Sequence, residues 1–244
     1  MSAIDDVFQR CRADRRAAFI PFLVAGDPSL ETTGELMRAM VDGGADMIEV
    51  GVPFSDPVAD GPTIQEAAQR ALDAGASLSG ILRVIAQHRD QLGVPIVLFT
   101  YFNPIHRRGV EHFAEQAAAS GVDGVLCVDL PPEEAAHELL PALRRHSLDT
   151  IFLLAPTSGK ERIRSVAAHS SGFVYYVSRT GVTGARDALP KELVKETRRL
   201  RRRLDAPLSV GFGISTPEQV EAVARVADGV VVGSALVSLI AEHA

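Results

Sequence analysis

The sequence predicts an α/β protein in which eight parallel strands close into a barrel. Eight short apolar runs recur along the 244 residues, and amphipathic stretches with helical spacing lie between them. The runs are hydrophobic throughout, as expected of strands that are covered on both faces. Strands that alternate with helices form a parallel sheet, and eight such units close it into a (β/α)8, or TIM, barrel.

The elements can be placed along the chain, and we expect all of them to form one domain spanning residues 1–244. The expected strands are 19–24, 46–51, 94–100, 124–128, 150–154, 173–177, 208–212 and 229–232. Helical spacing is clear at 31–41, 78–91, 110–119, 132–145, 160–169, 190–204 and 217–226. An extra short helix is expected at residues 2–13, before the first strand.

Composition excludes several classes of function. The net charge of −6 argues against nucleic acid as the main partner, and the basic run at 195–203 is typical of a solvated helix face. Cys11 and Cys127 are far apart and outside any metal-binding spacing, which argues against a disulfide framework or a zinc site. No apolar run reaches membrane-spanning length, and residues 1–16 lack the features of a signal peptide, so we expect a cytoplasmic protein.

The most informative segment is 47–62, MIEVGVPFSDPVADGP, where a carboxylate stands in an apolar strand. Burying Glu49 is costly unless its carboxyl group is paired, neutralised or used. A core glutamate satisfied by backbone donors is the alternative interpretation. Other common sites are absent: residues 24–28 lack the dinucleotide-binding glycine pattern, and no phosphate-loop, zinc-protease or serine-hydrolase motif occurs.

A barrel of this kind places its active site at the carboxyl ends of its strands. Glu49, Asp60, Asp129 and Tyr175 all lie at or just beyond such ends, so we expect them to converge on one mouth. The polar loop 178–186, which contains two glycines, suits a mobile lid, although an ordinary connection is the alternative.

Glycines after the last two strands predict a phosphate site. The segments GFGIS at 211–215 and GSA at 233–235 allow close backbone approach, and Gly233-Ser234 opens a helix whose amides favour an anion. With Gly184 available from the lid, a phosphate-bearing substrate is the preferred interpretation over a pair of tight turns.

At this level of detail the chain closely resembles the α subunit of tryptophan synthase. The matching motifs, in order, are FIPF at 19–22, GDP at 26–28, EVGVPFSDP at 49–57, ADGPTIQ at 59–65, SR at 178–179, GVTG at 181–184 and GFGI at 211–214. The resemblance implies retro-aldol cleavage of indole-3-glycerol phosphate to indole and glyceraldehyde 3-phosphate in tryptophan biosynthesis. Indole would then pass to a β subunit in an α2β2 heterotetramer.

The resemblance also implies roles for individual residues. Glu49 would be the acid and base, Asp60 would stabilise positive charge on the indole, and Thr183 would bond Asp60 when the lid closes. No metal or organic cofactor is expected on this chain, because pyridoxal phosphate (PLP) belongs to the β subunit. The remaining substrate-binding residues would be Phe22 and Phe212 around the indole, Tyr175 beside the glutamate, and Gly184, Gly213, Gly233 and Ser234 at the phosphate.

Two segments are the expected contact with the β subunit. One is the loop with Pro53, Phe54, Asp56 and Pro57, and the other contains Asn103 and Pro104. Phe54 between prolines is a plausible rigid anchor, with folding back over the barrel as the alternative. Two other functions stay open: a partner subunit that has lost its own turnover, and a different phosphate-binding barrel isomerase.

Overall fold

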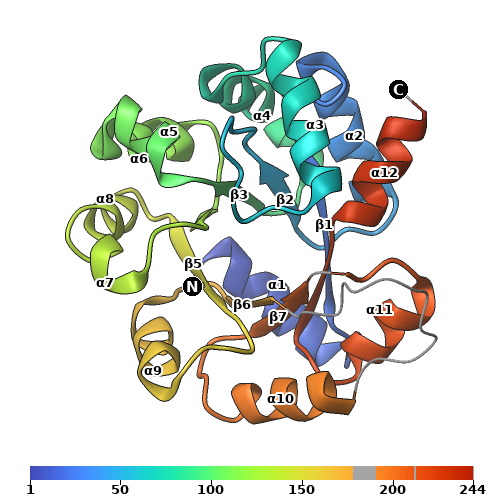
Figure 1. Cartoon of the computed structure of the whole chain (residues 1–244), viewed down its shortest axis with the longest axis vertical. Helices are drawn as coiled ribbons and strands as arrows, with labels where there is room; N and C mark the ends of the chain where they lie inside the picture. The colour runs from blue at the N-terminus through green and yellow to red at the C-terminus, as the bar shows by residue number, and fades with distance from the viewer. Residues whose placement is uncertain (178–190, 212, 244) are drawn as a thin grey trace.

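The structure, a computed structural model, describes residues 1–177, 191–211 and 213–243. Eight parallel strands pair in chain order, and β8 pairs with β1, so the barrel is closed as predicted (Figure 1). The strands are β1 (Ala18–Val24), β2 (Ile48–Gly51), β3 (Ile96–Thr100), β4 (Gly124–Cys127), β5 (Asp149–Leu154), β6 (Val174–Val177), β7 (Leu208–Gly211) and β8 (Gly229–Val232).

The helices that surround the barrel are α1 (Ala3–Ala13), α2 (Leu30–Asp42), α3 (Pro62–Asp73), α4 (Leu78–Leu92), α5 (Phe102–Arg108), α6 (Val110–Ala119), α7 (Pro132–Ala135), α8 (Leu139–Arg145), α9 (Lys160–His169), α10 (Lys191–Arg201), α11 (Pro217–Ala224) and α12 (Ser234–Glu242). Most of the predicted helices have bounds close to those expected, whereas α3 and α5 were not among them. The extra helix before the first strand is α1, which begins with a capping box formed by Ser2 and Asp5.

One predicted helix is wrong in its bounds. The stretch 132–145 is divided into α7 and α8 by a turn at 136–138. The physical reason is Pro141, which lacks the N–H that a continuous helix needs there and whose ring would clash with the carbonyl of His137. In the first turn of α8, where that N–H has no intrahelical partner, the same proline is tolerated.

The core has two layers because alternate strand residues face the barrel interior and the helices. Ile20, Phe22, Val97 and Leu126 belong to the inner cluster, which also includes apolar residues of α1. The ring of Phe8 in α1 packs 5.7 Å from that of Phe173, which immediately precedes β6. Helix α1 therefore covers the amino-terminal ends of the strands, and the carboxyl-terminal ends are left for a site.

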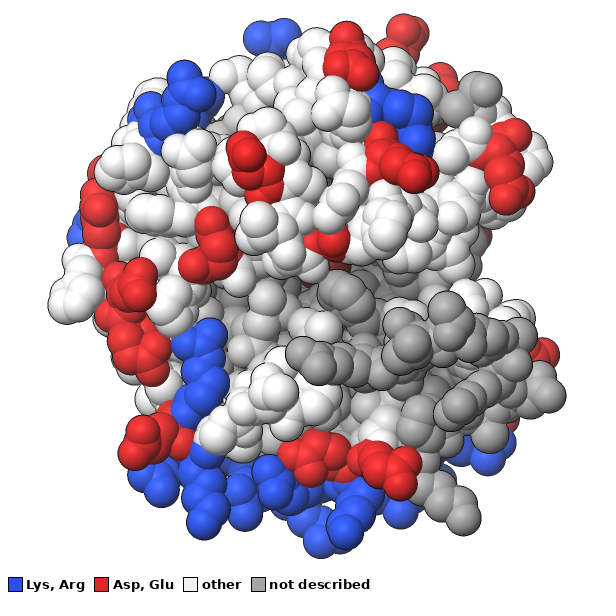
Figure 2. Space-filling view, in the orientation of Figure 1, with Lys and Arg blue, Asp and Glu red and all other residues white. Residues whose placement is uncertain are grey.

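The surface of α10 confirms the prediction for the basic run. Leu193 and Leu200 are buried against the barrel, whereas Arg198 and Arg199 are exposed. Figure 2 shows Lys and Arg gathering along the edge of the molecule where Figure 1 places α9 and α10. Within the described ranges, no helix combines the length and hydrophobicity that a membrane crossing requires.

Candidate active site

Glu49 lies inside the barrel on β2 and is 1% exposed. Its neighbours in register are Phe22 on β1 and Val97 on β3, so the carboxyl group has an apolar setting. Among the described residues, Oε1 of Glu49 has no hydrogen-bond partner. Burial raises the pKa of Glu49 to about 8, and the nearby charge of Asp60 adds to this. The group is therefore mostly protonated at neutral pH and is available as an acid.

Asp60 is the second carboxyl group, at the end of the loop between β2 and α3. Its Oδ2 accepts a hydrogen bond of 2.9 Å from the Tyr101 hydroxyl, and its backbone carbonyl accepts one of 2.9 Å from the Gln65 amide. Burial raises the pKa of Asp60, while the Tyr101 hydrogen bond opposes that rise. Tyr101, just beyond β3, therefore holds the carboxylate of Asp60, and Gln65 of α3 holds its backbone.

Tyr175 and Phe22 reach the site because glycines on neighbouring strands leave room for their rings. A Cβ atom at Gly211 would lie 2.2 Å from the Tyr175 hydroxyl, and one at Gly51 would lie 2.6 Å from Cζ of Phe22. Burial raises the pKa of Tyr175, and the charges of Glu49 and Asp60 raise it further. The phenol therefore stays neutral beside the two carboxyl groups.

These side chains surround a cavity of about 260 Å³ at the carboxyl-terminal mouth of the barrel. Its lining is Phe22, Glu49, Asp60, Gly61, Ile64, Phe99, Tyr175, Gly213, Ile214, Val231, Gly233 and Ser234. The structure thus brings together seven of the residues predicted for catalysis and substrate binding: Phe22, Glu49, Asp60, Tyr175, Gly213, Gly233 and Ser234. Three others, Thr183, Gly184 and Phe212, lie outside the described residues.

One edge of the cavity is the start of α12. Gly233 is the N-cap residue of this helix and makes no side-chain capping bond, and Ser234 is its first residue. The first amides of a helix have no intrahelical partner, and the helix dipole gives them partial positive charge. This edge can therefore receive an anionic group, and the rest of the lining offers carboxyl groups and aromatic rings.

Asp129 does not join the site, contrary to the expectation that it would converge with Glu49. It is absent from the cavity lining, and its Oδ1 accepts a hydrogen bond of 2.8 Å from the backbone N–H of Phe102. Because Phe102 is the first residue of α5, Asp129 holds the start of that helix. Its role in the structure is local.

Tyr101, Phe99 and Ile64 belong to the site or contact it but were not predicted from the sequence. Phe99 packs edge-to-face on Phe22, with ring centroids 5.5 Å apart, and Tyr101 bonds Asp60 directly. Both aromatic residues lie at the carboxyl-terminal end of β3 or just beyond it, so the rule that located Tyr175 could also have found them. Ile64 sits in the first turn of α3, for which the sequence offers no comparable signal.

The segment 53–57 packs partly onto the barrel. Pro53 is buried, and the half-buried ring of Phe54 lies 4.9 Å from the ring of Tyr101, which matches the folded-back alternative. Asp56 is exposed, and Val58 just beyond the segment is 85% exposed.

The second predicted contact segment is helical. Asn103 and Pro104 lie in the short helix α5, where Asn103 is exposed and Pro104 is half-buried. Both segments therefore lie on the surface near the mouth of the barrel.

A closed barrel whose mouth holds a buried glutamic acid, a second carboxyl group and the start of a helix is typical of the (β/α)8-barrel enzymes. The family model described as "Tryptophan synthase alpha chain" matches residues 8–244. The chain belongs to the tryptophan synthase alpha chain family.

Curated relatives and solved structures agree with this assignment. The tryptophan synthase alpha chain of Citrifermentans bemidjiense is 55% identical over 97% of this chain and 88% of its own length. The alpha chain of Geobacter sulfurreducens is 53% identical over 98% of this chain and 90% of its own length. The crystal structure of the alpha subunit from Legionella pneumophila str. Paris has a TM-score of 0.92 at 40% identity and covers 99% of this chain and 90% of its own. A Mycobacterium tuberculosis tryptophan synthase structure has a TM-score of 0.92 at 42% identity and covers 99% of this chain and 92% of its own chain.

The reaction of the alpha chain is the cleavage of indole-3-glycerol phosphate, a carbon–carbon lyase step in tryptophan biosynthesis. Its partner is the tryptophan synthase beta subunit, and PLP is not carried by the alpha chain itself. This assignment replaces the alternative of a different phosphate-binding isomerase.

Proposed function

We propose that Glu49 is both the acid and the base of the lyase reaction. Its protonated carboxyl group gives a proton to C3 of the indole ring, and the resulting carboxylate takes the proton of the glycerol hydroxyl. The bond between C3 and the glycerol carbon then breaks, its electron pair returns to the ring, and the hydroxyl carbon becomes the aldehyde. Glu49 ends the cycle protonated. The observation that carries this proposal is the buried carboxyl group with a pKa of about 8.

Asp60 supports the same step electrostatically. Protonation at C3 places positive charge on the indole nitrogen, and a carboxylate beside that nitrogen lowers the energy of the intermediate. Asp60 lines the cavity together with Glu49 and is held by Tyr101. Thr183 from the loop 178–186 would form a hydrogen bond with Asp60 when the loop closes. The same closure would then both exclude water and complete the site.

The remaining predicted residues would bind the substrate. Phe22, with Phe212, would enclose the indole ring, and Tyr175 would lie beside Glu49. The phosphate would rest on the amides of Gly184, Gly213 and Gly233 and on the Ser234 hydroxyl. The uncapped start of α12 and the position of Gly213 in the cavity lining support this placement.

The partner would bind across Pro53, Phe54, Asp56 and Pro57 together with Asn103 and Pro104 of α5. The exposed Val58 supports an interface here, because a large exposed apolar side chain next to a predicted contact segment gains burial on association. The assembly would be an α2β2 heterotetramer in the cytoplasm, to which each α chain contributes residues 1–244 as one barrel domain. We expect weak activity alone and a gain of more than about threefold in kcat/KM with the partner.

A subunit that has lost its own turnover is the second candidate. Against it stands the state of Glu49: Oε1 is buried with no hydrogen-bond partner among the described residues, which is costly to keep, and a chain without turnover gains nothing from it. Phe22, Asp60 and Tyr175 surround the same group in an arrangement that suits the reaction.

The test is indole release from indole-3-glycerol phosphate, measured with and without the beta subunit. Glu49→Gln should lower kcat by at least about a hundredfold, and Asp60→Asn should lower it far more than Asp60→Glu. Asp149→Asn is the matched control, because Asp149 is another buried carboxyl group with a raised pKa, at the start of β5 and outside the cavity. Full activity of Glu49→Gln would overturn the proposal, and no indole from the wild-type chain while it still stimulates the beta subunit would favour the second candidate.

A further inference from the structure

We propose that Tyr101 is a positioning residue that couples the partner-contact segments to Asp60. The inference rests on the proposed roles of Asp60 and of residues 53–57. Tyr101 is 2% exposed and lies between β3 and α5, immediately after the strand that neighbours the one carrying Glu49.

The hydroxyl group of Tyr101 holds the end of the loop between β2 and α3 by two bonds. It accepts a hydrogen bond of 3.0 Å from the backbone N–H of Ala59 and donates one of 2.9 Å to Oδ2 of Asp60. One atom therefore fixes both the backbone next to Asp60 and the direction of its carboxylate. Hydrogen bonds to a charged group are among the stronger ones in proteins.

The ring of Tyr101 meets the first predicted contact segment. The ring centroid of Phe54 is 4.9 Å away, with an angle of 32° between the two planes. A space of only about 10 Å³ lies among Phe54, Tyr101 and Asp60, which is room for one water molecule at most. Because of this contact, the half-buried Phe54 ring cannot move further toward the barrel unless Tyr101 moves with it.

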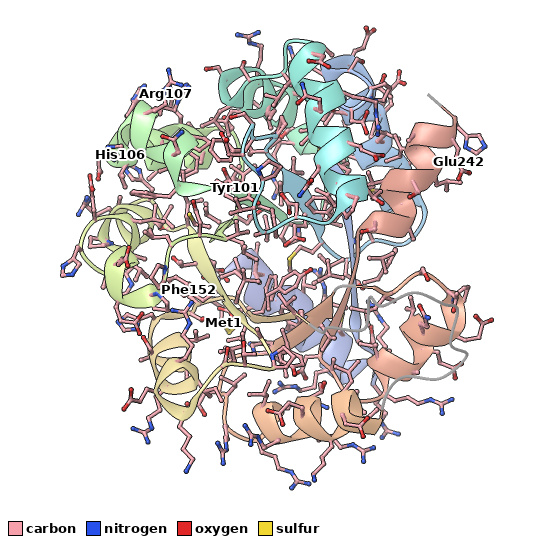
Figure 3. The ribbon with its side chains drawn as sticks, in the orientation of Figure 1. Met1, Tyr101, His106, Arg107, Phe152 and Glu242 are labelled. Atoms are coloured by element: carbon pink, nitrogen blue, oxygen red, sulfur yellow. The ribbon has the colours of Figure 1, made fainter. Side chains whose placement is uncertain are left out.

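Tyr101 also belongs to the second contact segment. It is the N-cap residue of α5, which carries Asn103 and Pro104, and Asp129 fixes the next residue through the N–H of Phe102. Figure 3 shows Tyr101 directed toward the centre of the molecule, whereas His106 and Arg107 of the same helix lie at its outer edge. Both segments that are expected to meet the partner therefore converge on the residue that holds Asp60.

A partner bound across these segments would restrain Tyr101 from two sides and so narrow the orientations open to Asp60. Such a coupling acts equally in both directions, so a ligand that engages Asp60 should also tighten binding of the partner. The titratable groups that sense Asp60 within the described structure are Glu49 on β2, Tyr101 itself and Tyr175 on β6. Removing the Tyr101 hydroxyl takes away the hydrogen bond that lowers the pKa of Asp60.

The experiment compares Tyr101→Phe with the wild-type chain in indole release, with and without the beta subunit and across pH. Tyr101→Phe keeps the ring against Phe54 and loses only the hydroxyl. Its kcat with the partner should fall about tenfold while KM changes less than about threefold, and the stimulation by the partner should shrink. The acidic limb of the kcat profile should move to higher pH. Tyr176→Phe is the control, because Tyr176 is a buried tyrosine on β6 in the outer layer. It should match wild type in kcat, in stimulation by the partner and in the position of the acidic limb.

The results that would contradict the coupling differ from those that would contradict the proposed function. A Tyr101→Phe chain with wild-type stimulation and an unmoved acidic limb would overturn the inference, even if its melting temperature fell, because that pattern belongs to a residue needed only for folding. Asp60→Asn separates this failure from failure of the proposed function. If Asp60→Asn loses activity while Tyr101→Phe behaves as wild type, only the coupling is wrong; if Asp60→Asn stays active, the role of Asp60 is wrong as well.

Discussion

Phe22 and Glu49 are direct partners in the parallel pairing of β1 with β2, and both residues face the barrel interior. Opposite residues of adjacent strands point to the same face of a sheet, so the register places an aromatic ring beside the carboxyl group. The ring removes water from Glu49 and lines the wall against which an indole would lie. One register position thus serves pKa tuning and, in the proposed function, substrate binding as well.

The pH dependence of activity follows from the two carboxyl groups. Glu49 must be protonated to act as an acid, so kcat should fall as pH rises through about 8. Asp60 must be ionised, so activity should also fall at low pH, with a midpoint above the ordinary Asp range because burial raises its pKa. Rates of indole release between about pH 5 and pH 9 test this. A basic limb starting well below pH 7 would contradict it.

Stability should depend on Glu49 with a definite sign. The folded pKa is about 8 and the ordinary value is 4.5, so between these values the folded state binds more protons than the unfolded state. Stability therefore falls as pH rises through this window, by about 1.4 kcal/mol for each unit of pKa difference. Glu49→Gln should remove this slope and be the more stable chain near pH 8. Urea unfolding at several pH values measures this slope. If the unfolding free energy of the two chains changed with pH in parallel, the prediction would be refuted.

Gly51 should resist substitution because of Phe22. A Cβ atom there would lie 2.6 Å from Cζ of Phe22, so Gly51→Ala should cost about 1–3 kcal/mol in unfolding free energy. Phe22→Leu should recover part of that loss in the double variant. Gly159→Ala is the control, since a Cβ atom at Gly159 meets nothing within 4 Å, and it should cost well under 1 kcal/mol. Equal losses at the two glycines would show that contact with Phe22 does not matter.

The ion pair of Arg70 with Asp27 should stabilise the mouth of the barrel. Asp27 is 2% exposed and receives hydrogen bonds of 2.8 and 2.7 Å from the Arg70 guanidinium of α3. Arg70→Ala would leave that carboxylate buried without its partner and should cost about 2–3 kcal/mol. Arg225→Ala removes an exposed pair with Glu221 and should cost less than about 0.5 kcal/mol. Urea unfolding that gives similar costs for both would contradict the prediction.

The fold could be predicted from the sequence because its signals are local. Eight apolar runs and the helices between them fix a parallel barrel, and the rule that sites lie at the carboxyl ends of strands brings Glu49 and Tyr175 together. The same rule failed for Asp129, because the position of a residue after a strand does not say whether its side chain turns inward. Asp129 instead bonds the N–H of Phe102.

Contacts between loops could not be read from the sequence. Tyr101 bonds a residue 41 positions away, and its ring packs on Phe54, which is even more distant along the chain. Such contacts depend on the path of the loop between β2 and α3, which has no periodic pattern. The break between α7 and α8 had a local signal in Pro141, but the helical spacing on either side of it masked the interruption.

A titration of the Glu49 carboxyl group itself would show most directly whether this group is the proton donor. Carbon-13 NMR of glutamate-labelled protein, with the resonance assigned by its loss in Glu49→Gln, would follow the group through the pH range. A pKa of about 8 is predicted, and it should fall in Asp60→Asn because the nearby charge is removed. A pKa near the ordinary 4.5 would mean that Glu49 is ionised at neutral pH and cannot be the proton donor.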